Sequence, residues 1–442
     1  MAVFIMNENH CAIIARIRTN PHPDPEVHSL AVGICCNETV IVSKSTPDNE
    51  LGIYFGCELQ IGQVFAEAND LIRRKDTVTG KPMGGMFDAN RRVRAQTFRG
   101  VKSEGFWAPL SYLKKCGVDI STLKEGQYID KIGDIQIACK YETEAQKKAQ
   151  GNGNSKKKNS NFSFKMLSWL TRLPKRKGKI CFPEHKDTSH FSKNLHKFNV
   201  GDNIVITLKQ EGSSQRVAYN YEYKPLTLFQ YLLSKFVPID TRQMRRYNGT
   251  RRVVLTDNSS GGYFSETFRK QVADKVLPYL TPQMEVFFEV VGYEGSRTIA
   301  PKQDIKDKAL KAKYGDKMIY KYGCQEGQFD IYVYRIAHVL ECGTEIDLPW
   351  GDVKKWCDAH KIKHVPELTS FKYDGDQDKL VALVESLSDG DSVIDPSHIR
   401  EGVCVRIDGS KWECFKNKSF DYKVLAGIAK DKSDFIDPED LS

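Results

Sequence analysis

No uninterrupted apolar run in this sequence is long enough to span a bilayer, and the mean hydropathy is −0.48. The opening residues, MAVFIMNENHCAIIARIR, lack the basic segment and continuous apolar stretch that together make a signal peptide. These absences disfavour a membrane-spanning or secreted protein. We expect a soluble protein of the cytoplasm or another reducing intracellular compartment, with no membrane partner.

The sequence also lacks the cysteine spacing that marks a zinc site. Its 12 cysteines include no Cys-x-x-Cys pair, and several lie in apolar, strand-like runs. Buried, reduced thiols explain them better than a metal site or a disulfide framework. His185, His190 and His196 are likewise spaced irregularly for a metal site, and we expect them at the surface or facing nucleic acid.

Length and charge set the remaining bounds. At 442 residues the chain is too long for one typical domain. Its 66 basic and 57 acidic residues give a net charge of +9, which suits a polyanionic partner without establishing one.

Changes in composition predict three regions. Residues 1–140 contain short β-branched runs at 11–17, 29–36, 39–42 and 52–55, which predict a β-rich domain. Residues 141–180 are rich in Lys, Gly, Asn and Ser and predict a flexible linker or insertion, with a short amphipathic helix at 164–173. Residues 181–442 alternate strand-like and helical patterns and predict a second, α/β-type domain.

A basic segment stands out in the first region. Arg92 and Arg94 alternate with Val93 and Ala95, so one face of a strand there would be mostly basic. Small β-barrels with a basic, aromatic-bearing face commonly bind nucleic acid, but a solvated sheet face fits equally well. The candidate nucleic-acid contacts are Arg91, Arg92, Arg94, Arg99 and Lys102.

The strongest candidate for chemistry is Lys209. The apolar run 204–208 predicts a strand that delivers this lysine to a turn containing Gly212 and two serines. The local pattern Lys-x-x-Gly is weak evidence, because it recurs in this chain, for example at Lys102 and Lys372. Of these lysines, Lys209 is the one that follows a convincing strand and has a particular series of motifs after it.

That series consists of an arginine after a small polar turn, a glutamate inside an apolar strand, an aromatic strand, a Glu-Gly pair and a Lys-x-Lys pair. The segments are Lys209-Gln210-Glu211-Gly212-Ser213, Gly249-Thr250-Arg251, Phe288-Glu289-Val290-Val291-Gly292, Ile331-Tyr332-Val333-Tyr334-Arg335-Ile336, Arg400-Glu401-Gly402-Val403 and Phe415-Lys416-Asn417-Lys418-Ser419. In this order they resemble the motifs of the covalent nucleotidyltransferase superfamily, which comprises ATP-dependent DNA and RNA ligases and mRNA capping enzymes. The resemblance covers roughly residues 185–430.

Within the superfamily the RNA ligases are the most similar. Few residues follow Lys418, whereas DNA ligases and capping enzymes generally need a further OB-fold domain there. The N-terminal region resembles the OB-like module that precedes the catalytic domain in one branch of RNA ligases. The implied fold class is α+β, an N-terminal OB-like β-barrel followed by a ligase-type nucleotidyltransferase domain with central antiparallel sheets and flanking helices. Two residues depart from the family pattern. The family has Asp or His where this chain has Glu211, and an acidic residue where this chain has Arg335.

The resemblance implies an ATP-dependent RNA ligase that joins 3′-OH and 5′-phosphate ends through lysyl-AMP and RNA-adenylate intermediates. The implied substrate is RNA, with a nicked duplex as our preferred form, in RNA repair, and we expect a monomer. The implied cofactors are ATP, whose AMP is carried on Lys209, and Mg²⁺ or Mn²⁺.

Roles for individual residues follow from the same resemblance. Lys209, Lys416 and Lys418 are the expected catalytic residues. The expected nucleotide-binding set adds Glu211, Gly212, Arg251, Glu289, Tyr334 and Glu401, of which Glu289 and Glu401 are also the expected metal ligands. Taken singly, each has an ordinary structural explanation, such as a salt bridge, a core aromatic or a solvated lysine.

Two alternatives stay open. A capping-type guanylyltransferase would use the same lysine but is disfavoured by the short segment after Lys418. A non-catalytic RNA-binding protein on a ligase fold is disfavoured because the lysines and glutamates of the motifs are all retained.

Overall fold

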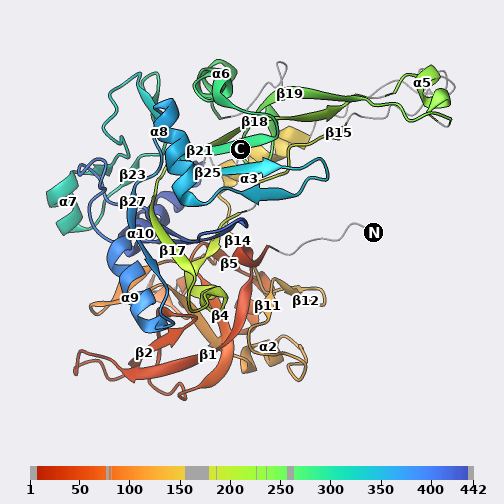
Figure 1. Cartoon of the computed structure of the whole chain (residues 1–442). Coiled ribbons are helices and arrows are strands. Elements are labelled where there is room, and N and C mark those ends of the chain that lie inside the picture. Colours follow the sequence, from red (N-terminus) through yellow and green to blue (C-terminus); the bar gives the residue numbers. More distant parts are fainter. Residues whose placement is uncertain are drawn as a thin grey trace.

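The computed structural model describes residues 7–75, 79–80, 82–154, 179–185, 187–224, 226–234, 236–255 and 263–436 (Figure 1). It has a mixed α+β fold, as predicted. The α-helices are α1 Gln63–Ala68, α2 Ser111–Lys115, α3 Glu144–Asn154, α5 Leu228–Leu233, α6 Glu266–Asp274, α7 Lys308–Tyr314, α8 Trp350–His360, α9 Gln377–Ser388 and α10 Phe420–Lys430. Short 3₁₀ turns occupy Glu8–His10, Phe191–Lys193, Leu195–Lys197 and Leu277–Tyr279. No helix in the described part of the chain is long and apolar enough to cross a membrane.

The N-terminal strands form a barrel-like sheet. They are β1 Ala12–Pro21, β2 Leu30–Cys35, β3 Glu38–Ser43, β4 Glu50–Gly56, β5 Leu59–Ile61, β6 Arg74–Lys75, β7 Pro82–Met83, β8 Gln96–Phe98, β9 Val101–Ser103, β10 Gly105–Pro109, β11 Tyr128–Ile129, β12 Lys131–Ile132, β13 Ile135–Gln136 and β14 Ala138–Lys140. The main sheet has the order β10-β4-β1-β2-β3, with β11 beside β1. Its two ends approach each other, because the Glu104 amide just before β10 donates to the Thr39 carbonyl of β3 at 2.8 Å. The barrel encloses a core that includes Ile14, Ile53 and Phe55.

One prediction for the first 180 residues needs correction. The basic strand expected at 92–97 is wrong, since β8 begins only at Gln96 and Arg92 is buried. Helix α3 lies within the region expected to be a linker or insertion, and that division of the chain stays a prediction. The amphipathic helix predicted at 164–173 lies outside the described residues.

The C-terminal part is built on two antiparallel sheets. Its strands are β15 Lys179–Ile180, β16 Ser189–His190, β17 Asn203–Lys209, β18 Ser213–Tyr223, β19 Arg242–Gly249, β20 Val254–Leu255, β21 Met284–Glu294, β22 Arg297–Thr298, β23 Gln303–Asp304, β24 Lys317–Met318, β25 Phe329–Val339, β26 Glu345–Asp347, β27 Glu367–Lys372, β28 Gly402–Ile407 and β29 Glu413–Lys418. The larger sheet has the order β20-β19-β18-β21-β25-β26, and the smaller one has the order β16-β29-β28-β17-β27. β17 belongs to the smaller sheet and β18 to the larger, so the turn that follows Lys209 joins the two.

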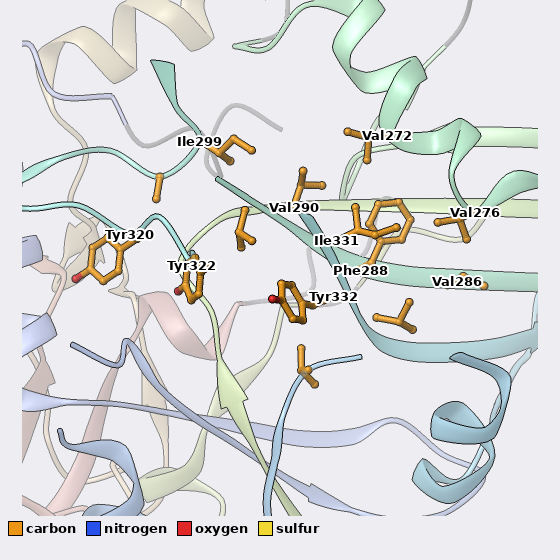
Figure 2. Packing of buried hydrophobic residues seen from close by; sticks show 14 of the residues in the cluster. Val272, Val276, Val286, Phe288, Val290, Ile299, Tyr320, Tyr322, Ile331 and Tyr332 are labelled. Atoms are coloured by element: carbon orange, nitrogen blue, oxygen red, sulfur yellow. The ribbon is translucent and has the colours of Figure 1, made fainter. Parts of the chain in front are cut away.

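The main core lies around the larger sheet. Strand β21 is buried along almost its whole length, which explains why its sequence is a nearly continuous apolar run. Figure 2 shows Phe288 and Val290 of this strand packed with Val272 and Val276 of the α6 region and with Ile331 of β25. This packing fixes the strands from which the polar side chains of the motifs project.

Candidate active site

Three neighbouring strands bring several of the sequence motifs together at one end of the smaller sheet. Lys209, the last residue of β17, pairs with Gly402, the first residue of β28, and Gly402 pairs in turn with Lys418, the last residue of β29. Because both pairs of strands are antiparallel, the end of β17, the start of β28 and the end of β29 coincide. Residues more than 200 positions apart in the chain therefore meet where the sequence predicted a single site.

A buried carboxylate links the two lysines. Glu401, just before β28, is 2% exposed and accepts a hydrogen bond from Lys209 Nζ at 2.8 Å, and its other oxygen lies 3.7 Å from Lys418 Nζ. Burial opposes the charge on Lys418, but the carboxylates of Glu58 and Glu401 outweigh it and raise the pKa of this lysine above its ordinary value. The strands thus hold the Lys209 and Lys418 ammonium groups against two carboxylates, Glu401 and Glu58.

Two glycines are required for this geometry. A Cβ on Gly212 would lie 2.4 Å from the Val290 carbonyl oxygen and 3.0 Å from Glu289 Oε1, so the turn after Lys209 passes directly against β21. Gly402 has a φ of +151° and its Cβ would meet the Asn417 carbonyl oxygen at 2.0 Å. The close approach of Gly212 to β21 also places the Glu289 carboxylate beside the turn that follows Lys209.

Glu289 and Tyr334 form the part of the site that belongs to the larger sheet. Glu289 of β21 pairs with Ser214 of β18, and the Ser214 hydroxyl lies 2.8 Å from the Tyr334 hydroxyl of β25. Burial, followed by the charge of Glu289, raises the pKa of Tyr334 above its ordinary value. Tyr334 therefore stays a neutral phenol held by a hydrogen bond, with a ring that is only partly buried.

Aromatic rings surround Tyr334. The ring centroid of His185 lies 4.9 Å from that of Phe287 and 5.8 Å from that of Tyr334, and Trp412 lies 6.4 Å from Tyr334. His185 was predicted at the surface, which is wrong, because it is buried among these rings. The cluster is suited to pack a flat heterocyclic base, as stacked rings commonly do.

Arg251 is anchored by a residue that the motifs did not indicate. Its guanidinium donates to Asp187 at 3.0 Å, and the neighbouring Arg252 donates to the other oxygen at 3.2 Å. Burial alone would raise the pKa of Asp187, but the two arginines outweigh it and hold that pKa below its ordinary value. Asp187 thus orients the Arg251 side chain while it stays ionised.

Three further residues support the turn after Lys209. Tyr422 donates to the Glu211 carboxylate at 2.6 Å, and the Glu211 amide donates to the Tyr322 hydroxyl at 2.6 Å. Arg269 of α6 is buried and donates to the Ser213 hydroxyl at 2.8 Å. A signal for Arg269 exists in the sequence, since it is a charged residue on the apolar face of an amphipathic helix; nothing local marks the two tyrosines.

The predicted nucleic-acid contacts have mixed positions. Arg92 donates to the Gly427 carbonyl at 2.7 Å and Arg94 pairs with Asp431 at 3.1 Å, so both bind the C-terminal helix region rather than forming an open basic face. The prediction of an exposed position is therefore wrong for Arg92. The other three differ in their surroundings: Arg91 donates to the Ile61 carbonyl, Lys102 is exposed but lies 3.5 Å from Asp389, and Arg99 is exposed.

The donor set suits hard cations and phosphates. Among the residues that the structure describes, no group of three or more His, Cys, Asp or Glu side chains could hold a metal ion by itself. Mg²⁺ is usually bound by one or two carboxylates, with water and substrate phosphate completing its shell. Glu289 and Glu401, which flank the Lys209 turn from the two sheets, fit that requirement.

Comparisons with known proteins give a match in structure only. No protein-family model matches the chain, and no curated protein sequence does. Solved structures of Naegleria gruberi RNA ligase match along nearly the whole chain. A lysine-to-alanine mutant with ATP and Mn has a TM-score of 0.56 at 15% identity and covers 93% of this chain and 96% of that one.

Two other structures of the same protein agree. A lysine-to-methionine mutant with AMP and Mn has a TM-score of 0.57 at 14% identity, covering 96% of this chain and 99% of that chain. The ligase with PPi has a TM-score of 0.56 at 14% identity, covering 93% and 97%. The chain therefore has the fold of an RNA ligase, and the resemblance predicted from the order of the motifs is confirmed at the level of the fold.

Proposed function

We propose that this protein is an ATP-dependent RNA ligase that joins a 3′-OH to a 5′-phosphate through a lysyl-AMP intermediate. The observation that carries the proposal is the position of Lys209. It lies at the turn between the two sheets of an RNA-ligase fold, 2.8 Å from a buried carboxylate that also approaches Lys418. The similarity to ligase structures that contain ATP, AMP and PPi supports the same chemistry.

In the first step Lys209 attacks the α-phosphorus of ATP. A free lysine titrates near pH ~10.4, so the Lys209 ammonium must first pass a proton to the Glu401 carboxylate, which accepts its hydrogen bond at 2.8 Å, and from there to solvent. The Nζ lone pair forms the P–N bond and Nζ releases a second proton to solvent, while the bond to the pyrophosphate oxygen breaks and leaves its electron pair on pyrophosphate. Lys416 and Lys418 stabilise the negative charge that develops at phosphorus.

Glu289 and Glu401 are the residues that would hold Mg²⁺ or Mn²⁺. A bound divalent cation supplies Lewis acidity toward the phosphate oxygens. The role of Glu401 toward Lys209 is separate, because its hydrogen bond at 2.8 Å fixes the direction of the nucleophile.

The remaining residues bind the nucleotide. Tyr334 stacks on adenine within the aromatic cluster, and Arg251, held by Asp187, donates to a phosphate or ribose oxygen. Glu211 and Gly212 shape the turn through which the α-phosphate approaches Lys209. These roles are part of the proposal.

Two further steps complete ligation. The 5′-phosphate of RNA attacks the lysyl-AMP, which regenerates Lys209 and forms an RNA-adenylate. The 3′-OH then attacks the 5′-phosphorus and AMP leaves with the electron pair. We assign RNA binding beside the break to the barrel of residues 1–140 and catalysis to residues 181–442. We further propose that the enzyme is a monomer and that its preferred substrate is a nicked duplex.

The test uses α-³²P-labelled ATP or GTP with the full-length protein and Mg²⁺, followed by denaturing electrophoresis. We expect covalent label from ATP that disappears in Lys209→Ala and persists in Lys372→Ala. Lys372 is a matched control because it lies in the adjacent strand β27, is exposed and belongs to another Lys-x-x-Gly sequence. Label from GTP alone would support a capping-type transferase instead.

A second assay tests the RNA. Nicked RNA duplexes that differ only in the groups at the nick, 3′-OH with 5′-phosphate against 3′-phosphate with 5′-OH, are incubated with the protein and ATP. We expect sealing of the first substrate only. An adduct with no sealing on any RNA would limit the proposal to nucleotidyl transfer.

A further inference from the structure

A carboxylate of the N-terminal barrel reaches into the candidate active site. Glu58, in the turn between β4 and β5, has its Oε1 atom 3.2 Å from Lys418 Nζ and 4.0 Å from Lys430 Nζ. These two lysines belong to the C-terminal domain, and the contact joins positions 360 residues apart. None of the motifs that mark the site includes this residue.

The barrel backbone holds Glu58 firmly. Its φ is +76°, an uncommon value for a residue other than glycine. Its amide donates to the Val93 carbonyl at 3.3 Å and its carbonyl accepts from the Tyr141 amide at 2.9 Å. Because an unfavourable backbone conformation persists only where the surroundings impose it, and such positions cluster at functional sites, this turn is built to present its side chain.

The surroundings of Glu58 keep it negatively charged. Burial opposes the charge, but Lys418, Lys430 and Lys416 outweigh it and hold the pKa of Glu58 well below its ordinary value. A permanent anion from the barrel therefore faces the basic groups of the catalytic domain.

Contacts on both sides of Glu58 fix the barrel against helix α10. Arg92 donates to the Gly427 carbonyl at 2.7 Å, and Lys423 lies 3.4 Å from Glu38 and 3.1 Å from Glu104 of the barrel. All these groups are largely buried. The Glu58–Lys418 pair is thus part of an interface between the barrel and α10. Several buried contacts fix its geometry, so it does not depend on a single flexible side chain.

We propose that Glu58 is a positioning residue of the active site, which orients the Lys418 ammonium toward the reacting phosphate, so that the N-terminal barrel completes the catalytic centre. This inference rests on the proposed function. An ammonium has three donors. Glu58 accepts one of them at 3.2 Å, whereas Glu401 lies 3.7 Å away, so the other donors can turn to a phosphate oxygen. Glu401 also serves Lys209, so Glu58 is the carboxylate that can hold Lys418 while Lys209 reacts.

The test compares Glu58→Gln with Glu58→Asp in the full-length protein. Gln keeps the shape of the side chain but removes the charge, and Asp restores the charge on a shorter side chain. Glu26→Gln is the matched control, because Glu26 is an exposed glutamate of the same domain. Single-turnover formation of the labelled adduct is measured over a range of ATP concentrations, with thermal unfolding recorded for each variant.

We expect the maximal adduct rate of Glu58→Gln to fall about 10- to 100-fold, the loss typical of one hydrogen bond to a charged group. The ATP concentration at half-maximal rate should change much less. Glu58→Asp should recover part of the rate, and Glu26→Gln should match the wild type.

Each other outcome has a definite meaning. A wild-type rate in Glu58→Gln would overturn the inference. A faster rate would also overturn it, because Glu58 would then compete with phosphate for Lys418. A reduced rate that Glu58→Asp does not recover, together with a lowered unfolding temperature in both Glu58 variants, would reduce the contact to a structural one. Absence of adduct from the wild type would instead refute the proposed function.

Discussion

Substitution of Gly212 by alanine tests the link between fold and site. The added Cβ would lie 2.4 Å from the Val290 carbonyl oxygen, and that atom belongs to the buried strand β21, which cannot move aside easily. Overpacking of this kind typically costs about 1–3 kcal/mol. The turn must shift instead, and this shift would move Lys209 with respect to Glu289.

A displacement of about 1 Å at a reacting group can reduce the rate about 100-fold. We therefore expect the free energy of unfolding of Gly212→Ala, measured in urea, to be about 1–3 kcal/mol lower than that of the wild type. The variant should also form the lysyl-AMP adduct about 100-fold more slowly. Gly351→Ala is the matched control: its Cβ would meet no atom within 4 Å, and it lies in helix α8, where alanine is favoured. Wild-type stability together with wild-type adduct formation in Gly212→Ala would refute this account of the turn.

Three further predictions concern other contacts. Tyr334→Ala should weaken ATP binding by about 1–3 kcal/mol, as expected for one stacked base, whereas Tyr334→Phe should lose far less; equal losses in equilibrium titration would exclude stacking. Arg269→Met should destabilise the protein by about 2–3 kcal/mol in urea unfolding, because Arg269 bonds to Ser213 and Gln215, and the exposed neighbour Lys270→Met should not. Burial, and then the charge of Glu38, raises the pKa of Glu104 to about 8. The folded state therefore binds the proton more tightly than the unfolded state, so stability should fall as the pH rises from about 5 to 8, and Glu104→Gln should flatten that dependence of the urea midpoint; an unchanged slope would contradict the assignment.

The parts of the fold that depend on local pattern could be predicted from the sequence. The β-branched runs predicted at 11–17, 29–36, 39–42 and 52–55 coincide largely with strands β1, β2, β3 and β4, because such runs between turn residues are a strong local signal. The meeting of Lys209, Glu401 and Lys418 was predicted from the order of the motifs, through a resemblance rather than from spacing alone.

The errors have a common physical cause. Arg92 looked like one residue of an alternating basic strand, but its partners, Gly427 and Asp431, lie more than 300 positions away in the chain. Glu58 carries no local signal for the same reason, since its role depends on how the barrel docks against α10. Contacts between domains are set by tertiary packing, which local patterns do not encode.

The most direct test of the central claim is the mass of the peptide that contains Lys209 after incubation with ATP and Mg²⁺. The protein is digested under mildly alkaline conditions, because a P–N bond to lysine is labile in acid. The account predicts an added AMP on Lys209, removed when pyrophosphate is supplied to reverse the step. An AMP found on another residue, or no modified peptide from a folded protein, would contradict it.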